Sequence, residues 1–363
     1  MAVRLKDIAR DLGVSLVTVS KAIRNKPDVG EATRKRVLRR VKELNYQPNM
    51  LARGLASGKS YSIGLIVPDL VHTFFAEIAR GASAALRRQS YQLILASAEE
   101  EPGLECQQIE HLLARGVDAL MIASCQNDAS SFKSIVKSRI PYVLLDRLLP
   151  GLDAYFVGTD DIAAGRMATE HLIHLGCKRI AHIGGELIST SVGRFNGYQQ
   201  ALAANHIPFC QELVATRSRL EEAGIEIGNS AMSNLLSLKK RPDAVFCYND
   251  LTAVGAIRCL LANKLRVPED MAVIGCGNLR LSSYLEVPLS TIDQSAQEQG
   301  EEAANLALSL IAQKQKRRAK HLLLEPKLIV RNSTVRPSPS ALRKSDPLVL
   351  ARSAPGQEQH LKR

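Results

Sequence analysis

Long apolar segments are missing from this sequence. No stretch reaches the roughly 18 consecutive apolar residues that a membrane-spanning helix needs. The first residues, MAVRLKDIARD, contain no apolar signal-peptide core. These absences predict a soluble, cytoplasmic protein with no membrane partner.

The motifs of metal sites and of common catalytic sites are missing as well. The seven cysteines include no C-x-x-C pair, which excludes a zinc ribbon or a dithiol redox site of that type. The chain has no G-x-x-x-x-G-K-[ST] phosphate loop, no G-x-G-x-x-G fingerprint and no G-x-S-x-G nucleophile elbow. We therefore expect no enzyme activity, no metal and no cofactor.

What the chain has in excess is positive charge, and this charge lies at its two ends. The 363 residues contain 48 Lys+Arg against 36 Asp+Glu, and this length suggests two or three domains. Residues 1–60 hold 14 basic and 5 acidic residues, residues 337–363 hold 5 and 2, and the rest holds 29 of each. A neutral body with a basic head is typical of a protein that binds nucleic-acid phosphates. The proline-containing tail is expected to be disordered.

Two short helices joined by a glycine turn are predicted near the N-terminus. Residues 4–12 place apolar side chains at helical spacing, Gly13 ends that helix, and Ser15 is a good N-cap for a second helix through about Asn25. A third, basic helix is predicted over 31–44. A generic helical hairpin could show this pattern, but the local charge favours a helix-turn-helix unit, whose second helix enters the major groove of DNA.

The start of the second helix supplies the predicted base contacts. Leu16 and Val17 cannot hydrogen-bond, so they would recognise bases by apolar contact with thymine methyl groups. The predicted DNA-contacting residues of this helix and its cap are Ser15, Leu16, Val17, Thr18, Ser20 and Lys21.

Ordered motifs through the head resemble the LacI/GalR family of bacterial transcription regulators. These motifs are Ile8-Ala9, Gly13-Val14-Ser15, Thr18-Val19-Ser20-Lys21, Thr33-Arg34 and Leu44-Asn45-Tyr46-Gln47-Pro48-Asn49. The resemblance implies that the next residues form a hinge helix, which folds on operator DNA, pairs with its dimer mate and wedges a leucine into the minor groove. The hinge residues expected at the DNA are Asn49, Ala52, Arg53 and, as the wedge, Leu55. A segment this short is not helical alone, which is consistent with ordering on binding.

The neutral body alternates short apolar runs with helical stretches from residue 61 onward. The expected strands are 63–67, 92–96, 119–123, 142–145, 179–183, 244–247, 271–274 and 290–293, and the expected helices are 77–88, 104–115, 163–176, 194–205, 228–237, 252–264 and 297–313. This order predicts an α/β body of doubly wound parallel sheets, and its length favours two lobes. The family resemblance continues to about residue 335 through Val67-Pro68-Asp69, Phe74-Phe75-Ala76-Glu77, Asp146-Arg147, Ile183-Gly184-Gly185, Asn249-Asp250 and Ser290-Thr291-Ile292-Asp293-Gln294. It implies a periplasmic-binding-protein-like core with an effector between the lobes.

The predicted domain organisation has four parts. They are a helix-turn-helix domain at 1–48, a hinge and linker at 49–60, an effector-binding and dimerisation core at 61–336, and a disordered basic tail at 337–363. Within the core, lobe 1 is expected over about 61–160 plus 293–322, and lobe 2 over about 161–290 plus 323–336.

Polar groups at strand ends are the candidates for an effector pocket. Ligands of open parallel sheets bind at the carboxyl ends of the strands. By the resemblance, Arg194 is an effector-contacting arginine and Phe74 an aromatic that packs on the effector. The predicted effector-binding residues are Asp69, Phe74, Asp146, Arg194, Arg219, Asn249, Asp250 and Gly277. Each also has a structural alternative, since the aspartates could cap helices and Phe74 could belong to the core.

Two departures from the family's sugar-binding pattern bear on the effector. Gly277 stands where many sugar-binding members carry an aspartate, and Arg219 replaces a pocket aromatic in a loosely aligned segment. A lost carboxylate and a gained guanidinium favour an anionic ligand. The effector is therefore expected to be a sugar, with a sugar acid or sugar phosphate as the specific hypothesis. Weakened or displaced effector control is the alternative.

The sequence thus predicts a repressor that binds double-stranded, pseudo-palindromic operator DNA as a homodimer associated with the nucleoid. Protein twofold symmetry would match operator symmetry, and the effector would shift the population of the DNA-competent dimer. A transport-type binding protein would share the fold of the body, but the basic head and the missing signal peptide argue against it. A coiled-coil tetramer is not expected, because the tail has no sustained apolar heptads.

Overall fold

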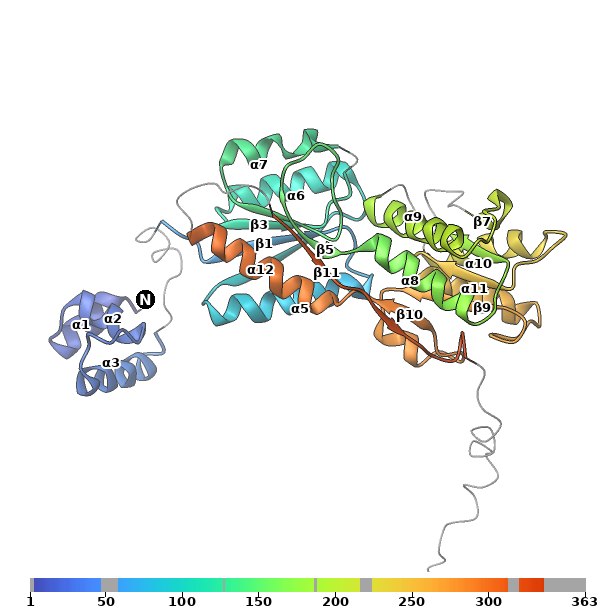
Figure 1. Ribbon diagram of the computed structural model, residues 1–363. Helices are drawn as coiled ribbons and strands as arrows, with labels where there is room; N and C mark the ends of the chain where they lie inside the picture. Colours follow the sequence, from blue (N-terminus) through green and yellow to red (C-terminus); the bar gives the residue numbers. More distant parts are fainter. Residues whose placement is uncertain are drawn as a thin grey trace, which may run out of the picture. The chain divides into compact units, whose positions relative to one another are not determined.

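A computed structural model describes residues 3–46, 58–126, 128–185, 188–215, 224–312 and 320–335. The chain divides into a small N-terminal unit and a larger unit that begins at Ser62 (Figure 1). Each unit is considered by itself.

The N-terminal unit is a three-helix head. Its helices are α1 (Leu5–Leu12), α2 (Leu16–Ile23) and α3 (Glu31–Glu43). The backbone of Gly13 has a φ of 64°, a left-handed conformation that favours glycine, and the Ser15 side chain caps α2. Both predictions for the turn are confirmed. The second helix is two residues shorter than predicted, because Asn25 has a φ of 52°.

A small apolar core holds the three helices together. It is formed by Ile8, Ala9, Val19, Ala22, Val29, Val37 and Tyr46. Val19 and Ala22 are the buried side of α2. The opposite side of α2 is therefore not needed to complete this core.

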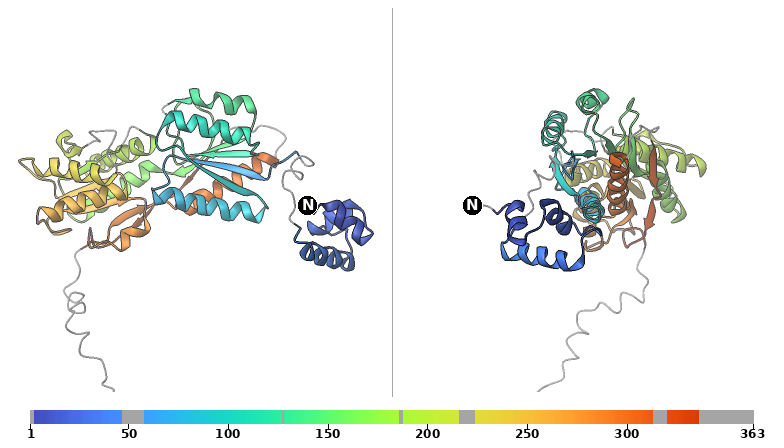
Figure 2. Two further views of the ribbon diagram at one scale, coloured as in Figure 1. Left: turned by 180° about the vertical axis from the view of Figure 1, so that it is seen from behind. Right: turned by 90° about the vertical axis from the view of Figure 1, so that its left-hand side faces the viewer.

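The larger unit contains two six-stranded sheets, in agreement with the predicted α/β architecture. The elements of the first lobe are β1 (Ser62–Val67), α5 (Thr73–Arg88), β2 (Gln92–Ser97), α6 (Pro102–Ala114), β3 (Ala119–Ile122), η1 (Ala129–Phe132), α7 (Lys133–Ser138), β4 (Tyr142–Leu145), β5 (Tyr155–Thr159), α12 (Ala296–Ala312) and β11 (His321–Leu324). Its strand order is β11-β5-β4-β3-β1-β2, with all pairs parallel. Helices α6 and α7 cover one face of this sheet, and α5 and α12 cover the other (Figures 1 and 2).

The second lobe repeats this architecture. Its elements are α8 (Asp161–His174), β6 (Ile180–Ile183), α9 (Ser189–Ala204), η2 (Gln211–Leu213), β7 (Val214–Ala215), α10 (Gly224–Leu236), β8 (Ala244–Cys247), α11 (Asp250–Ala262), β9 (Ala272–Cys276), η3 (Arg280–Ser283), β10 (Ser290–Asp293) and β12 (Lys327–Ile329). The strand order is β12-β10-β9-β8-β6-β7, and only β12 runs antiparallel to its neighbour. Helices α8 and α9 pack on one face, and α10 and α11 on the other.

The chain passes between the lobes three times. The crossings follow β5, β10 and β11, so the expectation of more than one crossing is confirmed. Strand β10 belongs to the second sheet up to Asp293, and β11 extends the first sheet to Leu324, which places two crossings a few residues beyond the predicted positions. This arrangement brings the carboxyl ends of strands from both sheets toward one region.

Candidate nucleic-acid interface and ligand site

The start of α2 presents an unusual exposed surface. The Ser15 hydroxyl accepts a hydrogen bond from the backbone N–H of Thr18 at 3.0 Å, and its oxygen lies 2.8 Å from the Thr18 hydroxyl oxygen. Leu16 and Val17 follow this cap and are 51% and 57% exposed. Because the buried side of α2 already packs in the core, these two apolar side chains have no role inside the head. They are suited to contact an external apolar surface.

The remaining predicted residues of α2 lie on or beside that surface. Thr18, Ser20 and Lys21 are half-buried, and Lys21 is ion-paired with Asp28. The α2 residues predicted to contact DNA are therefore brought together on one side of the helix. The hinge residues Asn49, Ala52, Arg53 and Leu55 lie outside the described residues.

Much of the positive charge on α3 is used within the head. Arg34 donates to the backbone oxygens of Lys26 and Val29 at 2.7 and 3.0 Å. Arg40 forms an ion pair with Asp11 at 2.7 Å. The net charge of the head favours DNA, but these two arginines mainly fix the positions of loops and helices.

A cluster of buried charges occupies the strand ends of the larger unit. Arg194, on α9, is 4% exposed, and it donates to the Asp161 carboxylate at 2.9 Å and to the Tyr248 backbone oxygen at 2.7 Å. Burial raises the pKa of Asp161 from 3.8 to about 7, although Arg194 opposes that shift. Asp146, from the end of β4 in the other lobe, is also buried, and its pKa is raised by burial against the attraction of Arg194 and Arg147.

A second arginine completes this cluster from the first lobe. Arg147 makes a two-pronged ion pair with Glu100, with N–O distances of 2.8 and 2.9 Å, and its guanidinium lies 5.9 Å from the ring centre of Phe75. Burial lowers the pKa of His72. The positive charges of Arg147 and Arg194 lower it further, and the negative charge of Asp69 opposes the shift. Charged and polar groups from both lobes therefore lie where they can contact a polar ligand.

Two predicted ligand residues are used inside the second lobe. The Asp250 carboxylate is fully buried and accepts hydrogen bonds from the Leu279 backbone N–H, the Ser282 hydroxyl and the Thr291 hydroxyl. The Asn249 side chain caps α11 by accepting from the Thr252 N–H at 2.8 Å. In this conformation Asp250 supports the loop after β9 and Asn249 caps α11, which are structural roles of the kind that the sequence left open for strand-end polar groups.

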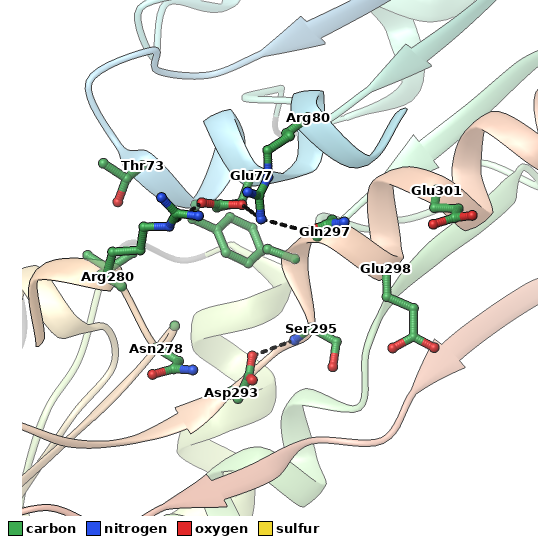
Figure 3. A pocket seen from close by; sticks show the side chains of 14 residues that line it. Thr73, Glu77, Arg80, Asn278, Arg280, Asp293, Ser295, Gln297, Glu298 and Glu301 are labelled. Carbon is green, nitrogen blue, oxygen red and sulfur yellow. Dashed lines mark hydrogen bonds and ion pairs between the residues drawn. The ribbon is translucent and has the colours of Figure 1, made fainter. Parts of the chain in front are cut away.

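A pocket of about 410 Å³ lies beside the loop after β9 and between elements of the two lobes (Figure 3). Phe74 and Gly277 are the predicted effector residues that line it. Gly277 has a φ of 133°, a conformation that an aspartate would rarely adopt, so the departure from the family pattern affects the backbone as well as the charge.

An ion-pair network spans this pocket. Glu77 on α5 contacts Arg80 at 2.7 Å and Arg280 of the second lobe at 3.0 Å, and Arg80 also donates to Gln297 (Figure 3). The ion pair between Glu77 and Arg280 was not predicted from the sequence. No local signal could have predicted it, because 203 positions separate them in the chain.

Of the two remaining predicted ligand residues, the structure describes one. Asp69 accepts a hydrogen bond from the Val71 N–H at 2.7 Å in a local turn, and Arg219 lies outside the described residues. Asp161, Glu100 and the Tyr248 carbonyl were missed, although Asp160-Asp161 after a predicted boundary was a usable signal. Among the described residues, no group of three His, Cys, Asp or Glu side chains could hold a metal ion. In the same part of the chain, no helix is long and apolar enough to cross a membrane.

Two family models match the chain. One describes bacterial regulatory proteins of the lacI family and covers residues 4–49, and the other describes a periplasmic binding protein-like domain and covers residues 169–334. Similar curated proteins include the HTH-type transcriptional repressor PurR of Mannheimia succiniciproducens, which is 33% identical over 91% of this chain and 98% of its own length. The PurR repressor of Haemophilus influenzae strain PittEE is also 33% identical over the same shares.

Solved structures agree with this assignment. The transcriptional regulator CelR–cellobiose complex is 30% identical, covers 91% of this chain and 99% of its own, and has a TM-score of 0.68. The lac repressor dimer bound to operator and the anti-inducer ONPF is 25% identical, covers 92% and 100%, and has a TM-score of 0.79. Curated relatives of this similarity are repressors rather than enzymes. With its helix-turn-helix head and two-lobed core, the chain belongs to the LacI family of bacterial regulatory proteins and is a DNA-binding transcriptional repressor.

Proposed function

We propose that the protein represses transcription by binding a pseudo-palindromic operator as a homodimer, under the control of a small sugar-like effector. The observation that carries the DNA-binding part is the exposed apolar pair Leu16 and Val17 on a helix whose other side completes the head core. Apolar side chains at that position suit thymine methyl groups in the major groove. By family resemblance, Asn49, Ala52 and Arg53 also contact the DNA, and Leu55 is the wedge in the minor groove.

Selection of DNA from a random-sequence pool by the full chain tests this proposal. We expect an enriched sequence with twofold symmetry and A·T pairs in each half-site. Leu16→Ala and Val17→Ala should each weaken binding to that sequence about fivefold or more, since one lost base contact costs about 1 kcal/mol. Leu38→Ala, at an exposed leucine on α3, is the matched control and should bind as the wild type does. Enrichment of no sequence, or equal effects of all three substitutions, would contradict the proposal.

The effector is proposed to bind at the buried charges between the lobes. Arg194, Asp161 and Asp146 supply a cation and two carboxyls from both sides of this region, so a bound ligand can favour one arrangement of the lobes. The structural neighbours include complexes with cellobiose and with ribose. Gly277 removes a carboxylate that would hold sugar hydroxyls, and this favours a sugar acid or a sugar phosphate for this chain.

Thermal unfolding with matched ligand sets discriminates these effectors. Each neutral sugar is compared with its acid and with its phosphate, and Arg194→Met is included as the variant that should lose the response. Stabilisation by an acid or a phosphate, absent in Arg194→Met, supports the proposal. Stabilisation by neutral sugars alone would overturn the anionic effector while leaving the site in place.

Exposed apolar residues near the junction of the lobes support a dimer. Val71 and Tyr284 are 86% and 84% exposed, and Leu70 and Leu281 are exposed beside them in sequence. Clusters of this kind are typical of association surfaces, and a twofold dimer would place two heads on two half-sites. The protein is proposed to act in the cytoplasm, on DNA of the nucleoid.

A further inference from the structure

The only cation within α2 has a carboxylate partner in the head itself. Helix α2 has the sequence LVTVSKAI, and its single charged side chain is Lys21. The Lys21 ammonium forms an ion pair and donates a hydrogen bond to the Asp28 carboxylate. That hydrogen bond lowers the pKa of Asp28, so the carboxylate stays ionised near neutral pH.

The other carboxylates of the described head pair elsewhere. Their partners all lie on α1 or α3: Asp7 pairs with Arg10, Asp11 with Arg40, Glu31 with Lys35, and Glu43 with Arg39 and Arg40. Among residues 3–46, Asp28 is therefore the one carboxylate that forms an ion pair with a cation of α2.

The loop that carries Asp28 is fixed to the head. Arg34 donates from α3 to the backbone oxygens of Lys26 and Val29, on both sides of Asp28. Val29 is buried in the head core, and the Lys26 N–H donates to the Lys21 backbone oxygen at 3.0 Å. Asp28 is thus held beside the end of α2 by contacts that do not involve its own side chain.

We propose that Asp28 is a specificity-determining residue, which holds Lys21 until DNA offers an acceptor that replaces the carboxylate. This inference rests on the proposed placement of α2 against DNA. On random DNA, Lys21 must break its ion pair with Asp28 to contact a phosphate, so the exchange of one anion for another adds little to the binding free energy. The unpaired Asp28 carboxylate then lies near the phosphate backbone and is repelled by it. A base edge with two acceptors at fixed positions, such as guanine O6 and N7, offers Lys21 two hydrogen bonds that only the correct sequence places within reach, in addition to the nearby phosphates. Asp28 therefore weakens binding to random DNA more than binding to the operator.

Salt dependence of DNA binding tests this proposal. The full-length wild type and Asp28→Asn are titrated with a random-sequence duplex and with the duplex that the wild type enriches. On random DNA, the plot of log K against log salt should become steeper by about 0.9 in Asp28→Asn, since a freed Lys21 releases one more counterion. Between roughly 50 and 200 mM salt, this variant should lose about 3.5-fold more affinity than the wild type. Its operator affinity should change less, so the ratio of specific to random binding should fall.

Two further variants separate this role from a general charge effect. Asp11→Asn makes the same chemical change at a carboxylate whose partner, Arg40, lies on α3, and its salt slope should match that of the wild type. In a Lys21→Ala background, Asp28→Asn should no longer steepen the slope. Thermal unfolding of each variant checks that the head is folded.

The outcomes are distinct. The proposed role of Asp28 is wrong if Asp28→Asn has the same salt slope as Asp11→Asn. It is also wrong if Asp28→Asn still steepens the salt slope in the Lys21→Ala background. If the wild type enriches no DNA sequence, the proposed operator recognition is wrong instead.

Discussion

At the scale of single residues, His182 is a histidine used as an apolar side chain. It lies on β6, it is 1% exposed, and its ring centre is 5.0–5.6 Å from those of Phe195, Tyr198 and Phe246. Neither ring nitrogen has a well-formed hydrogen bond among the described residues, although the Phe246 backbone lies close enough to oppose the effect of burial on the pKa. Burial lowers its pKa from 6.5 to about 3, so the ring is neutral in the folded protein.

His182 should make the protein less stable in mild acid. Below pH 6.5 the unfolded chain binds a proton that the folded chain excludes, so folding stability falls as the pH decreases from about 6.5 toward 3. At pH 5 this loss is about 2 kcal/mol, because each pKa unit is worth about 1.4 kcal/mol. His182→Phe should remove this part of the pH dependence. Denaturant unfolding at several pH values measures it, with His174→Phe at an exposed histidine as the control.

If stability fell as much in acid for His182→Phe as for the wild type, the prediction for His182 would be wrong. That result would mean that other groups carry the pH dependence. The prediction would also be wrong if His174→Phe reduced the acid-side loss of stability as much as His182→Phe does. His174 is exposed at the end of α8, so its replacement should not change the pH dependence.

At the scale of elements, the packing of α8 against α9 positions Arg194. A Cβ on Gly165 would lie 2.0 Å from the Arg194 backbone oxygen, and a Cβ on Gly197 would lie 2.1 Å from that of Ile162. These distances are far below van der Waals contact, so the two helices approach as closely as they do only because both positions are glycine.

Gly165→Ala should separate these helices and displace Arg194. Overpacking of this kind costs about 1–3 kcal/mol, which denaturant unfolding measures. The thermal shift caused by an effector should shrink as well, because Arg194 moves relative to Asp161. Gly103→Ala on α6 is the matched control, since a Cβ there meets no atom within 4 Å. Equal stability of the two variants would show that α8 and α9 can adjust without cost.

At the scale of the whole molecule, the exposed surface near the lobe junction should control oligomeric state. Tyr284→Asp places a charge on a surface that we propose to be buried between two copies, and it should convert a dimer to a monomer. Light scattering after size-exclusion chromatography measures the mass, and operator affinity should fall because two heads no longer bind together. Leu323→Asp, at an exposed leucine on β11, is the control and should stay dimeric. An unchanged mass for Tyr284→Asp would place the interface elsewhere.

Local patterns predicted much of this architecture. Gly13 and Ser15 define the turn of the head within a few residues, and the β–α alternation predicts most strands and helices. Strands β5, β7, β11 and β12 were missed, because they have two to five residues and gain their pairing from distant segments. The role of Asp250 was also beyond local reasoning, since its donors come from residues 279, 282 and 291.

The three crossings between the lobes have a consequence for how the chain is made. During synthesis from the N-terminus, the head core is complete once Tyr46 has left the ribosome, because it uses only residues 3–46. The sheet of the first lobe is complete only with β11 and that of the second only with β12, which are the last strands among the described residues. A nascent chain can therefore complete the core of its DNA-binding head before either lobe, and with the lobes the proposed effector site, is complete.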